Sequence, residues 1–316
     1  MDFATRTTTP STKVPIRLAS CIWRQVAKTP VCPETPRLDG KLALVTGGNA
    51  GLGLEIARGL AERGAEVVIA ARNERTSAEA CERIQSETRK PASYAPLDLS
   101  NLESVMRSLD RVGEIAAGRS FDLVVANAGV WPQQYEKSAQ GHEMAFAVNT
   151  LGHFVLITRM LARGLLKAGR VVVLTGDIYI RSSECTRDFT YEGRSGGSMA
   201  YCRSKLGNIW FTRELQRRHA ELEVVTVHPG VVATGLGGQA PLTGFRAKMR
   251  DLFILNPEAG AQTPLFCATQ PNLERGGYYH NTLGRITLSP EDPAANDPKA
   301  RELWERMEAL SQDFPQ

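Results

Sequence analysis

The sequence predicts a doubly wound α/β domain, in which helices cover both faces of a parallel sheet. Two observations lead to this prediction. Short apolar runs alternate with helical patterns from Lys41 onward, as expected of parallel strands joined by crossover helices. The first run, residues 42–45, is followed by Gly47, Gly51 and Gly53 and then by apolar residues at helical spacing. A strand, a glycine-rich turn and a helix start in this order are typical of a nucleotide-binding sheet.

The later elements follow from the same patterns. Residues 65–71 read Ala-Glu-Val-Val-Ile-Ala-Ala and indicate a second buried strand. The Glu-, Arg- and Ala-rich stretch 74–90 favours a helix, and Pro96 interrupts the third strand, 93–97. Further strands are expected at 122–126, 170–174 and 223–227, and further helices at 101–117, 140–167 and 199–219.

Composition limits the function classes. With 316 residues, 42% hydrophobic and 23% charged, the chain is long enough for a substantial core. A net charge of +4 is too small to indicate a nucleic-acid partner. The six cysteines contain no Cys-x-x-Cys pair and the five histidines show no ligand spacing. We therefore expect reduced thiols, a cytoplasmic location and no metal site.

The chain divides into an N-terminal extension, 1–38, and one catalytic domain, 39–316. Residues 14–28 are weakly amphipathic and poor in acidic residues, which permits peripheral membrane contact or targeting. A helix packed on the domain, or an arm on a partner subunit, fits the same pattern. No run reaches the roughly 18–20 uninterrupted apolar residues of a spanning helix.

The glycine turn predicts a site for the phosphates of a dinucleotide. Glycine lets the backbone approach closely, and the positive end of a helix attracts the negative charge. Arg72 follows the second strand, where a site for NAD usually carries Asp or Glu. An arginine there would attract a 2′-phosphate, so we expect NADP(H). A turn that only packs a helix on the sheet, with Arg72 as a solvated side chain, is the alternative.

Two further strand ends carry candidate cofactor contacts. Asp98 and Leu99 follow the third strand, and Asp98 could hold the adenine amino group or cap the next helix. Asn127, Ala128 and Gly129 follow the fourth strand, and their small side chains suit a backbone that passes close to a flat ligand.

The candidate chemistry lies on the expected helix 199–219. Tyr201 and Lys205 are four residues apart, so they project from one face. An ammonium near a phenol favours the phenolate and lowers its pKa, which makes Tyr201 a usable general acid or base for an alcohol–carbonyl pair. A surface Tyr and Lys is the alternative for this pair in isolation.

These motifs together resemble the short-chain dehydrogenase/reductase family, from about residue 40 to residue 234 and in the same order. The nearest pattern is similar to the retinol-dehydrogenase-like branch, which prefers NADP(H) and acts on lipophilic alcohols and carbonyl compounds. The resemblance rests on Asn49 in the glycine turn, Arg72, a long loop before the tyrosine, and the sequence Ala-Tyr-Cys-Arg-Ser-Lys. It implies pairing of two copies through the long helices near Asn149 and Tyr201.

The resemblance also assigns roles. Tyr201 would exchange the proton, Lys205 would hold the nicotinamide ribose and lower the pKa of Tyr201, and Asn149 would position a water next to Lys205. The implied cofactor contacts are Gly47, Asn49, Gly51, Leu52, Gly53, Arg72, Asp98, Leu99, Asn127, Ala128, Gly129, Tyr201, Lys205, Pro229, Gly230, Val232 and Thr234.

One position departs from the family. The family carries a serine after the fifth strand that orients the substrate oxygen, and ungapped alignment places Gly176 there. We expect a shifted turn, in which Thr175 or Asp177 takes over as a catalytic residue. A substrate hydroxyl could also fill the gap.

The sequence therefore predicts an NADP(H)-dependent oxidoreductase for a lipophilic alcohol or carbonyl compound, with substrate loops at about 178–198 and 235–256. Because of Gly176, a weak or inactive NADP(H)-binding protein is one alternative. Reduction of an activated C=C bond, with the same proton donor, is another.

Overall fold

The computed structural model describes residue 25 and residues 31–185, 189, 197–233, 236 and 254–314. These residues form one eight-stranded sheet in the order β3-β2-β1-β4-β5-β6-β7-β8. Neighbouring strands are parallel, except that β7 and β8 are antiparallel. The strands are β1 (Leu42–Thr46), β2 (Glu66–Ala71), β3 (Ala92–Pro96), β4 (Phe121–Ala126), β5 (Leu166–Leu174), β6 (Glu223–His228), β7 (Tyr278–His280) and β8 (Gly284–Ile286).

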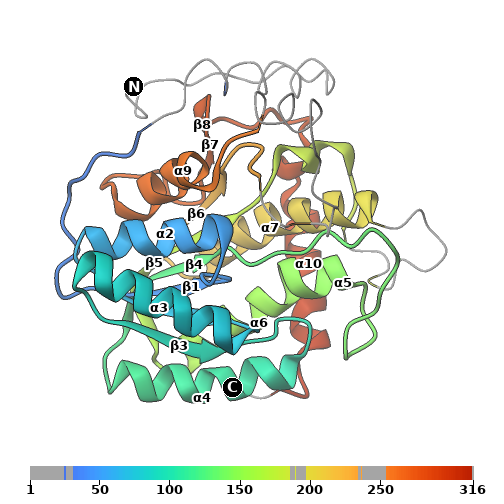
Figure 1. Cartoon of the computed structure of the whole chain (residues 1–316). Helices are drawn as coiled ribbons and strands as arrows, with labels where there is room; N and C mark the ends of the chain where they lie inside the picture. Colours follow the sequence, from blue (N-terminus) through green and yellow to red (C-terminus); the bar gives the residue numbers. More distant parts are fainter. Residues whose placement is uncertain are drawn as a thin grey trace, which may run out of the picture.

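Helices cover both faces of this sheet (Figure 1). They are α2 (Gly51–Glu62), α3 (Glu74–Thr88), α4 (Leu102–Ala116), α5 (Met144–Phe146), α6 (Gly152–Ala162), α7 (Ser198–Arg218), α9 (Pro257–Thr269) and α10 (Asp297–Leu310). A π-helical turn, Ala147–Leu151, joins α5 to α6, and short 3-10 helices lie at Asp177–Arg181 and Pro293–Ala295. The predicted doubly wound fold is confirmed.

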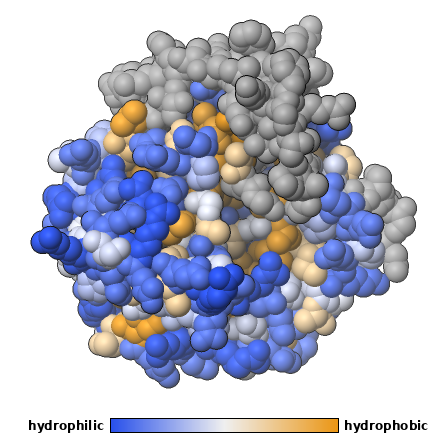
Figure 2. All heavy atoms as spheres, in the orientation of Figure 1, coloured by the Kyte–Doolittle hydropathy of each residue, from blue (hydrophilic) through white to orange (hydrophobic). Residues whose placement is uncertain are grey.

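The core has two halves, one on each face of the sheet. One half contains buried residues of α2, α3 and α9, and the other contains those of α4, α6, α7 and α10. The strands alternate between the two halves: Leu44 belongs to one cluster and Val45 to the other. Figure 2 shows a mainly hydrophilic surface over α3, with hydrophobic side chains gathered nearer the centre of the view.

The expected strands and helices are present from β1 to β6, with boundaries that shift by a few residues. The largest shift is at the helix expected over 140–167, because Arg163 ends α6 and the chain enters β5 at Leu166. In the described part of the chain, the stretch Met144–Ala162 is long and apolar enough to cross a membrane. As 83% of that window is buried inside the protein, a core helix accounts for it equally well.

Gln25 links the N-terminal extension to the catalytic domain. Its side-chain oxygen accepts hydrogen bonds from Val231 N at 3.1 Å and from Asn281 Nδ2 at 3.3 Å, and its Nε2 donates to Val231 O at 3.3 Å. Gln25 is only 2% exposed. The loop after β6 is therefore held by a residue that lies outside the expected domain boundary at residue 39.

Candidate active site

The glycine turn after β1 is packed too tightly for larger residues. Gly47 and Gly51 have φ values of +65° and +53°, which favour glycine. A Cβ on Gly53 would lie 2.2 Å from Gly47 O and 2.4 Å from Asn127 Nδ2. No described side chain caps α2 at Ala50. The first N–H groups of α2 can therefore receive an anion such as a phosphate.

The other expected residues of the turn are placed differently. The Asn49 Nδ2 atom donates to Thr76 Oγ1 at 2.8 Å, so this side chain ties the turn to α3. Leu52 is 8% exposed and belongs to the core. Leu52 can therefore contact a phosphate through its backbone N–H but not through its side chain.

Arg72 lies beside the glycine turn. Gly47 N donates to Ala70 O at 2.8 Å, and Arg72 follows two residues later at the end of β2. Its side chain is exposed, and no hydrogen bond or ion pair joins it to a described residue. A cation in this position is available to a phosphate that extends from the turn.

Asp98 does not cap α4, because the Asn101 side chain does so by accepting from Glu103 N. Asp98 Oδ1 instead accepts from Ser100 N at 2.9 Å and from Ser100 Oγ at 2.7 Å. Leu99 is buried, and its carbonyl would lie 2.5 Å from a Cβ on Gly152. Both residues shape the end of β3.

Asn127 and Ala128 connect the end of β4 to the end of β1, where the glycine turn begins. The backbone N–H groups of both donate to Thr46 Oγ1, at 3.0 and 2.9 Å. Asn127 Nδ2 donates to Thr46 O at 2.8 Å. Gly129 follows, and its ideal Cβ would lie 3.3 Å from Asn149 Oδ1 and 3.7 Å from Lys205 Nζ.

Thr46 is also hydrogen-bonded to a buried histidine that the sequence did not single out. His153 Nδ1 lies 3.1 Å from Asn149 O, and its Nε2 lies 2.8 Å from Thr46 Oγ1. Because the carbonyl only accepts, Nδ1 carries the proton and Nε2 accepts from the threonine. Burial lowers the pKa of His153 to about 4, so the ring is neutral.

Asn149 lies in the π-helical turn, a feature that is frequent at functional sites. Its Oδ1 accepts from Val130 N at 2.8 Å, and its Nδ2 donates to Val130 O at 3.0 Å and to Ser204 Oγ at 2.9 Å. Ser204 Oγ donates to Tyr201 O at 2.8 Å. Asn149 thus connects the loop after β4 to α7.

Tyr201 and Lys205 lie together near the N-terminal end of α7. The Lys205 Nζ atom is 5.4 Å from the centroid of the Tyr201 ring and 3.4 Å from Leu174 O at the end of β5. Burial lowers the pKa of Lys205 to about 8. Burial also raises the pKa of Tyr201. In the structure burial sets the direction of this shift, because it disfavours the charged phenolate. The expected lowering of the Tyr201 pKa by Lys205 stays a prediction.

Gly176 leaves room beside Lys205. Its backbone is extended, with φ −155° and ψ 141°, and an ideal Cβ would lie 3.8 Å from Ile178 Cγ2 and 3.9 Å from Lys205 Cγ. Those are ordinary contact distances. Neither backbone strain nor crowding among the described residues requires glycine here.

The two expected replacements for the serine have other partners. Thr175 Oγ1 donates to Lys205 O at 2.7 Å, and the Asp177 carboxylate accepts from Tyr278 OH at 2.7 Å and lies 3.1 Å from His280 Nε2. Both residues are buried. These contacts argue against the expectation that Thr175 or Asp177 orients the substrate oxygen.

Asp177 forms a buried cluster with His228 and His280, the last residues of β6 and β7. One potential ligand atom from each lies within 4.8 Å of the others. His280 Nδ1 accepts from Thr282 N at 3.1 Å, so Nε2 carries the proton and donates it to Asp177. In this tautomer the Nε2 atom of His280 is a donor to Asp177 rather than a ligand atom.

The sequence missed this cluster because it depends on strand register. His228 and His280 are paired residues of β6 and β7, although 52 positions separate them. The identities of the residues give no signal of that pairing.

The loop after β6 contacts α9 and Gln25. Gly230 has φ +96°, and its ideal Cβ would lie 2.4 Å from Asn281 Nδ2, while Pro229 is buried. Val232 bridges to Leu255 and lies against Gly260 of α9. Thr234 lies outside the described residues.

The expected substrate loops are only partly described. In the first, Cys185 is fully buried and Phe189 stacks on Phe146, with ring centroids 4.3 Å apart. These two side chains belong to the core. Most of the second loop, 235–256, lies outside the described residues.

An aromatic residue that the sequence did not single out covers Tyr201. The Trp131 ring stacks on the Tyr201 ring with centroids 4.7 Å apart and planes 5° apart. Both residues are half-buried. The sequence feature that could have pointed to this contact is the position of the tryptophan, two residues after the Asn-Ala-Gly tripeptide.

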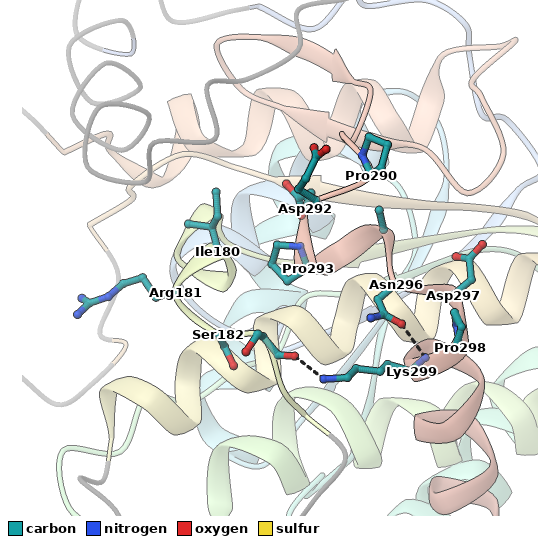
Figure 3. Close-up of a pocket in the computed structure, with 13 residues that line it drawn as sticks. Ile180, Arg181, Ser182, Pro290, Asp292, Pro293, Asn296, Asp297, Pro298 and Lys299 are labelled. Carbon is teal, nitrogen blue, oxygen red and sulfur yellow. Dashed lines mark hydrogen bonds between the residues drawn. The ribbon is translucent and has the colours of Figure 1, made fainter.

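A pocket of about 790 Å³ lies outside this constellation. Residues 180–183 and most of 290–299 line it, and Lys299 Nζ donates to Ser183 O at its edge (Figure 3). Neither the glycine turn nor Tyr201 contributes to its lining. It is therefore separate from the expected cofactor contacts.

Comparison with known proteins finds related sequences over most of the chain. A family model described as short chain dehydrogenase matches residues 41–242. Human retinol dehydrogenase 12 is 36% identical over 279 residues, covering 87% of each chain. A short-chain dehydrogenase/reductase of Armillaria gallica is 31% identical over 297 residues, covering 89% of this chain and 93% of that protein.

Solved structures show the same fold. An uncharacterised protein from Mycobacterium paratuberculosis has a TM-score of 0.70 at 29% identity, covering 88% of this chain and 95% of that one. A Burkholderia cenocepacia short chain dehydrogenase in complex with NADP has a TM-score of 0.62 at 24% identity, covering 79% and 99%.

Proposed function

The chain belongs to the short-chain dehydrogenase/reductase family, and from that premise we propose that it is an NADP(H)-dependent enzyme that interconverts an alcohol and a carbonyl group on a lipophilic small molecule. The observation that carries the proposal is the position of Tyr201 and Lys205. They lie together on α7, next to the end of β5 and to Gly129. In an open α/β sheet, ligands bind beyond the carboxyl ends of the strands.

The residues present fit a dinucleotide. The crowded turn at Gly53 and the uncapped start of α2 suit a pyrophosphate, and exposed Arg72 suits a 2′-phosphate. When bound, NADP(H) supplies the hydride carrier. Lys205 would hold the nicotinamide ribose.

Tyr201 would transfer the proton. Because burial raises its pKa, the phenol stays protonated at neutral pH and can donate to a carbonyl oxygen during reduction. For alcohol oxidation the phenol must first lose this proton, so that direction is expected to speed up as the pH rises. Retinol dehydrogenases 11, 12 and 14 are among the relatives, which supports a lipophilic substrate.

The test is oxidation of NADPH, and separately of NADH, with a panel of lipophilic ketones and aldehydes. Cofactor affinity is measured in parallel by fluorescence titration. Tyr201→Phe is expected to lower kcat by about 10²–10⁴-fold, while the variant still binds NADPH. Undiminished turnover by this variant would refute the role of Tyr201.

A second function has one observation in its favour. Gly176 offers no side-chain donor to a substrate oxygen, which suits a protein that binds NADP(H) without turnover. Tight binding of NADPH with no turnover across the panel would favour that function.

A further inference from the structure

We propose that Trp131 is a positioning and specificity-determining residue, which holds the plane of the Tyr201 phenol and forms the wall that limits one side of the substrate. This inference rests on the proposed function, because it assigns to Tyr201 the contact with the substrate oxygen. It begins from the nearly parallel stack of the two rings, 5° apart in plane.

The backbone on the N-terminal side of Trp131 is fixed. Asn149 forms two hydrogen bonds with Val130, one to its N–H and one to its carbonyl. The same amide reaches Tyr201 through Ser204 Oγ. Asn149 therefore ties the segment that carries Trp131 to the helix that carries Tyr201.

The C-terminal side of Trp131 is fixed by close packing. Gly197, just before α7, has φ +62°, and its ideal Cβ would lie 2.4 Å from Pro132 O. That approach is possible because position 197 has no side chain. Val130 is therefore held by the π-helical turn, and Pro132 lies against the N-cap of α7.

These contacts form a closed circuit. Hydrogen bonds connect the Tyr201 carbonyl to Ser204, Ser204 to Asn149, and Asn149 to Val130. Val130 is followed by Trp131, whose ring stacks on the Tyr201 ring. A phenol ring held in this way has one preferred plane. Its hydroxyl is thereby aimed before a substrate arrives, which is what efficient proton transfer requires.

The stack also limits the substrate. A carbonyl oxygen bonded to the Tyr201 hydroxyl would lie about 2.6–3.2 Å from it. Substituents on that carbonyl then lie within reach of an indole stacked on the same ring. Trp131 is half-buried, so part of its surface can meet such a group. Branched substituents on the Trp131 side are expected to be excluded.

The experiment compares a tert-butyl ketone with an unbranched methyl ketone of equal carbon number. In Trp131→Ala, the kcat/KM ratio of branched to unbranched ketone is expected to rise about tenfold or more. Turnover of the unbranched ketone is expected to fall, because the phenol is no longer held, while NADPH affinity stays within about twofold. Trp131→Phe should give intermediate values.

The matched control for Trp131→Phe is Trp304→Phe, the same substitution in a buried tryptophan of α10 that packs on Phe154. It should leave the ratio unchanged. A ratio in Trp131→Ala within about twofold of the native value, or an equal rise for both ketones, would overturn the specificity role.

A readout that needs no turnover separates this inference from the proposed function. Near-ultraviolet circular dichroism of Trp131→Ala, Tyr201→Ala and the double variant is expected to change non-additively, because each single change removes the same stacked pair. Additive changes would overturn the stack itself. A native protein that reduces no carbonyl but shows non-additive spectra would refute the proposed function and leave the positioning of Tyr201 standing.

Discussion

The hydroxyl of Thr175 donates a 2.7 Å hydrogen bond to the carbonyl oxygen of Lys205. This bond fixes the end of β5 against α7, and it places Gly176 where a Cβ would lie 3.9 Å from Lys205 Cγ. A side chain at position 176 would therefore reach the space next to Lys205, the proposed ribose-binding residue.

The first prediction concerns that position. Gly176→Ser is expected to raise kcat for ketone reduction about tenfold or more, because the extended backbone accepts a side chain and a hydroxyl adds a donor for the substrate oxygen. Steady-state kinetics with NADPH measure the effect. Gly176→Ala adds the same Cβ without the donor and should leave kcat near the native value. Equal rates for the serine and alanine variants would rule out a missing hydrogen bond.

The second prediction concerns Arg72. Arg72→Asp should raise the Kd for NADPH about 10–100-fold, because a charge-assisted hydrogen bond to the 2′-phosphate is lost and a repulsion is added. The Kd for NADH should change little. Arg107→Asp, an exposed position on α4, controls for the change in net charge. If both cofactors weaken equally in Arg72→Asp, the preference for NADP(H) does not come from this residue.

The third prediction concerns stability in acid. Burial lowers the pKa of His153 to about 4, whereas the pKa of a histidine in the unfolded chain is about 6.5. Between these values the unfolded chain binds a proton that the folded chain does not, so stability falls as the pH drops through this window. The loss contributed by His153 reaches about 3 kcal/mol at pH 4.

Urea unfolding of the native protein and of His153→Gln between pH 7 and pH 4.5 tests this. Glutamine can also donate to Asn149 O and accept from Thr46, but it does not titrate. The variant should lose less stability on acidification than the native protein. Parallel curves would show that other groups cause the acid sensitivity.

The fourth prediction concerns the glycine turn. Gly53→Ala places a methyl group 2.2 Å from Gly47 O, a backbone atom, so the turn must shift. We expect a loss of about 1–3 kcal/mol in the free energy of unfolding and a large loss of NADPH affinity. Gly113→Ala, also in a helix, meets its nearest neighbour at 3.8 Å and should be neutral or stabilising by up to about 1 kcal/mol. If Gly53→Ala binds NADPH with native affinity, the glycine turn is not part of the binding site.

Local patterns in the sequence were sufficient for the sheet up to β6. Apolar runs indicate strands and glycine turns indicate where the chain leaves them, so these elements can be predicted without knowledge of any long-range contact. The last elements, α9, β7, β8 and α10, were not predicted. β7 has only three residues, and α9 has an apolar composition spread around the helix with Pro264 inside it.

The site was predicted in its parts but not in its contacts. The Tyr201–Lys205 pair follows from helical spacing, yet the direction of the Tyr201 pKa depends on burial, which spacing does not report. The partners of Asp177 come from β7, and the Trp131 stack joins a loop to a helix 70 residues later. Such contacts are set by strand register and loop geometry, which residue identity alone does not determine.

Gln25, in the N-terminal extension, is hydrogen-bonded to the loop after β6 of the catalytic domain. A shortened protein that starts at residue 31 would leave the backbone N–H of Val231 and the amide of Asn281 without the acceptor that Gln25 supplies. The Val231 carbonyl would lose the Gln25 donor and keep the hydrogen bond from Leu255 N. Removing residues 1–30 would thus disturb a loop that lies 206 positions after Gln25 in the sequence. This loop is next to the strand ends where the ligand is expected. Recombinant forms meant for kinetics should therefore keep the N-terminal extension.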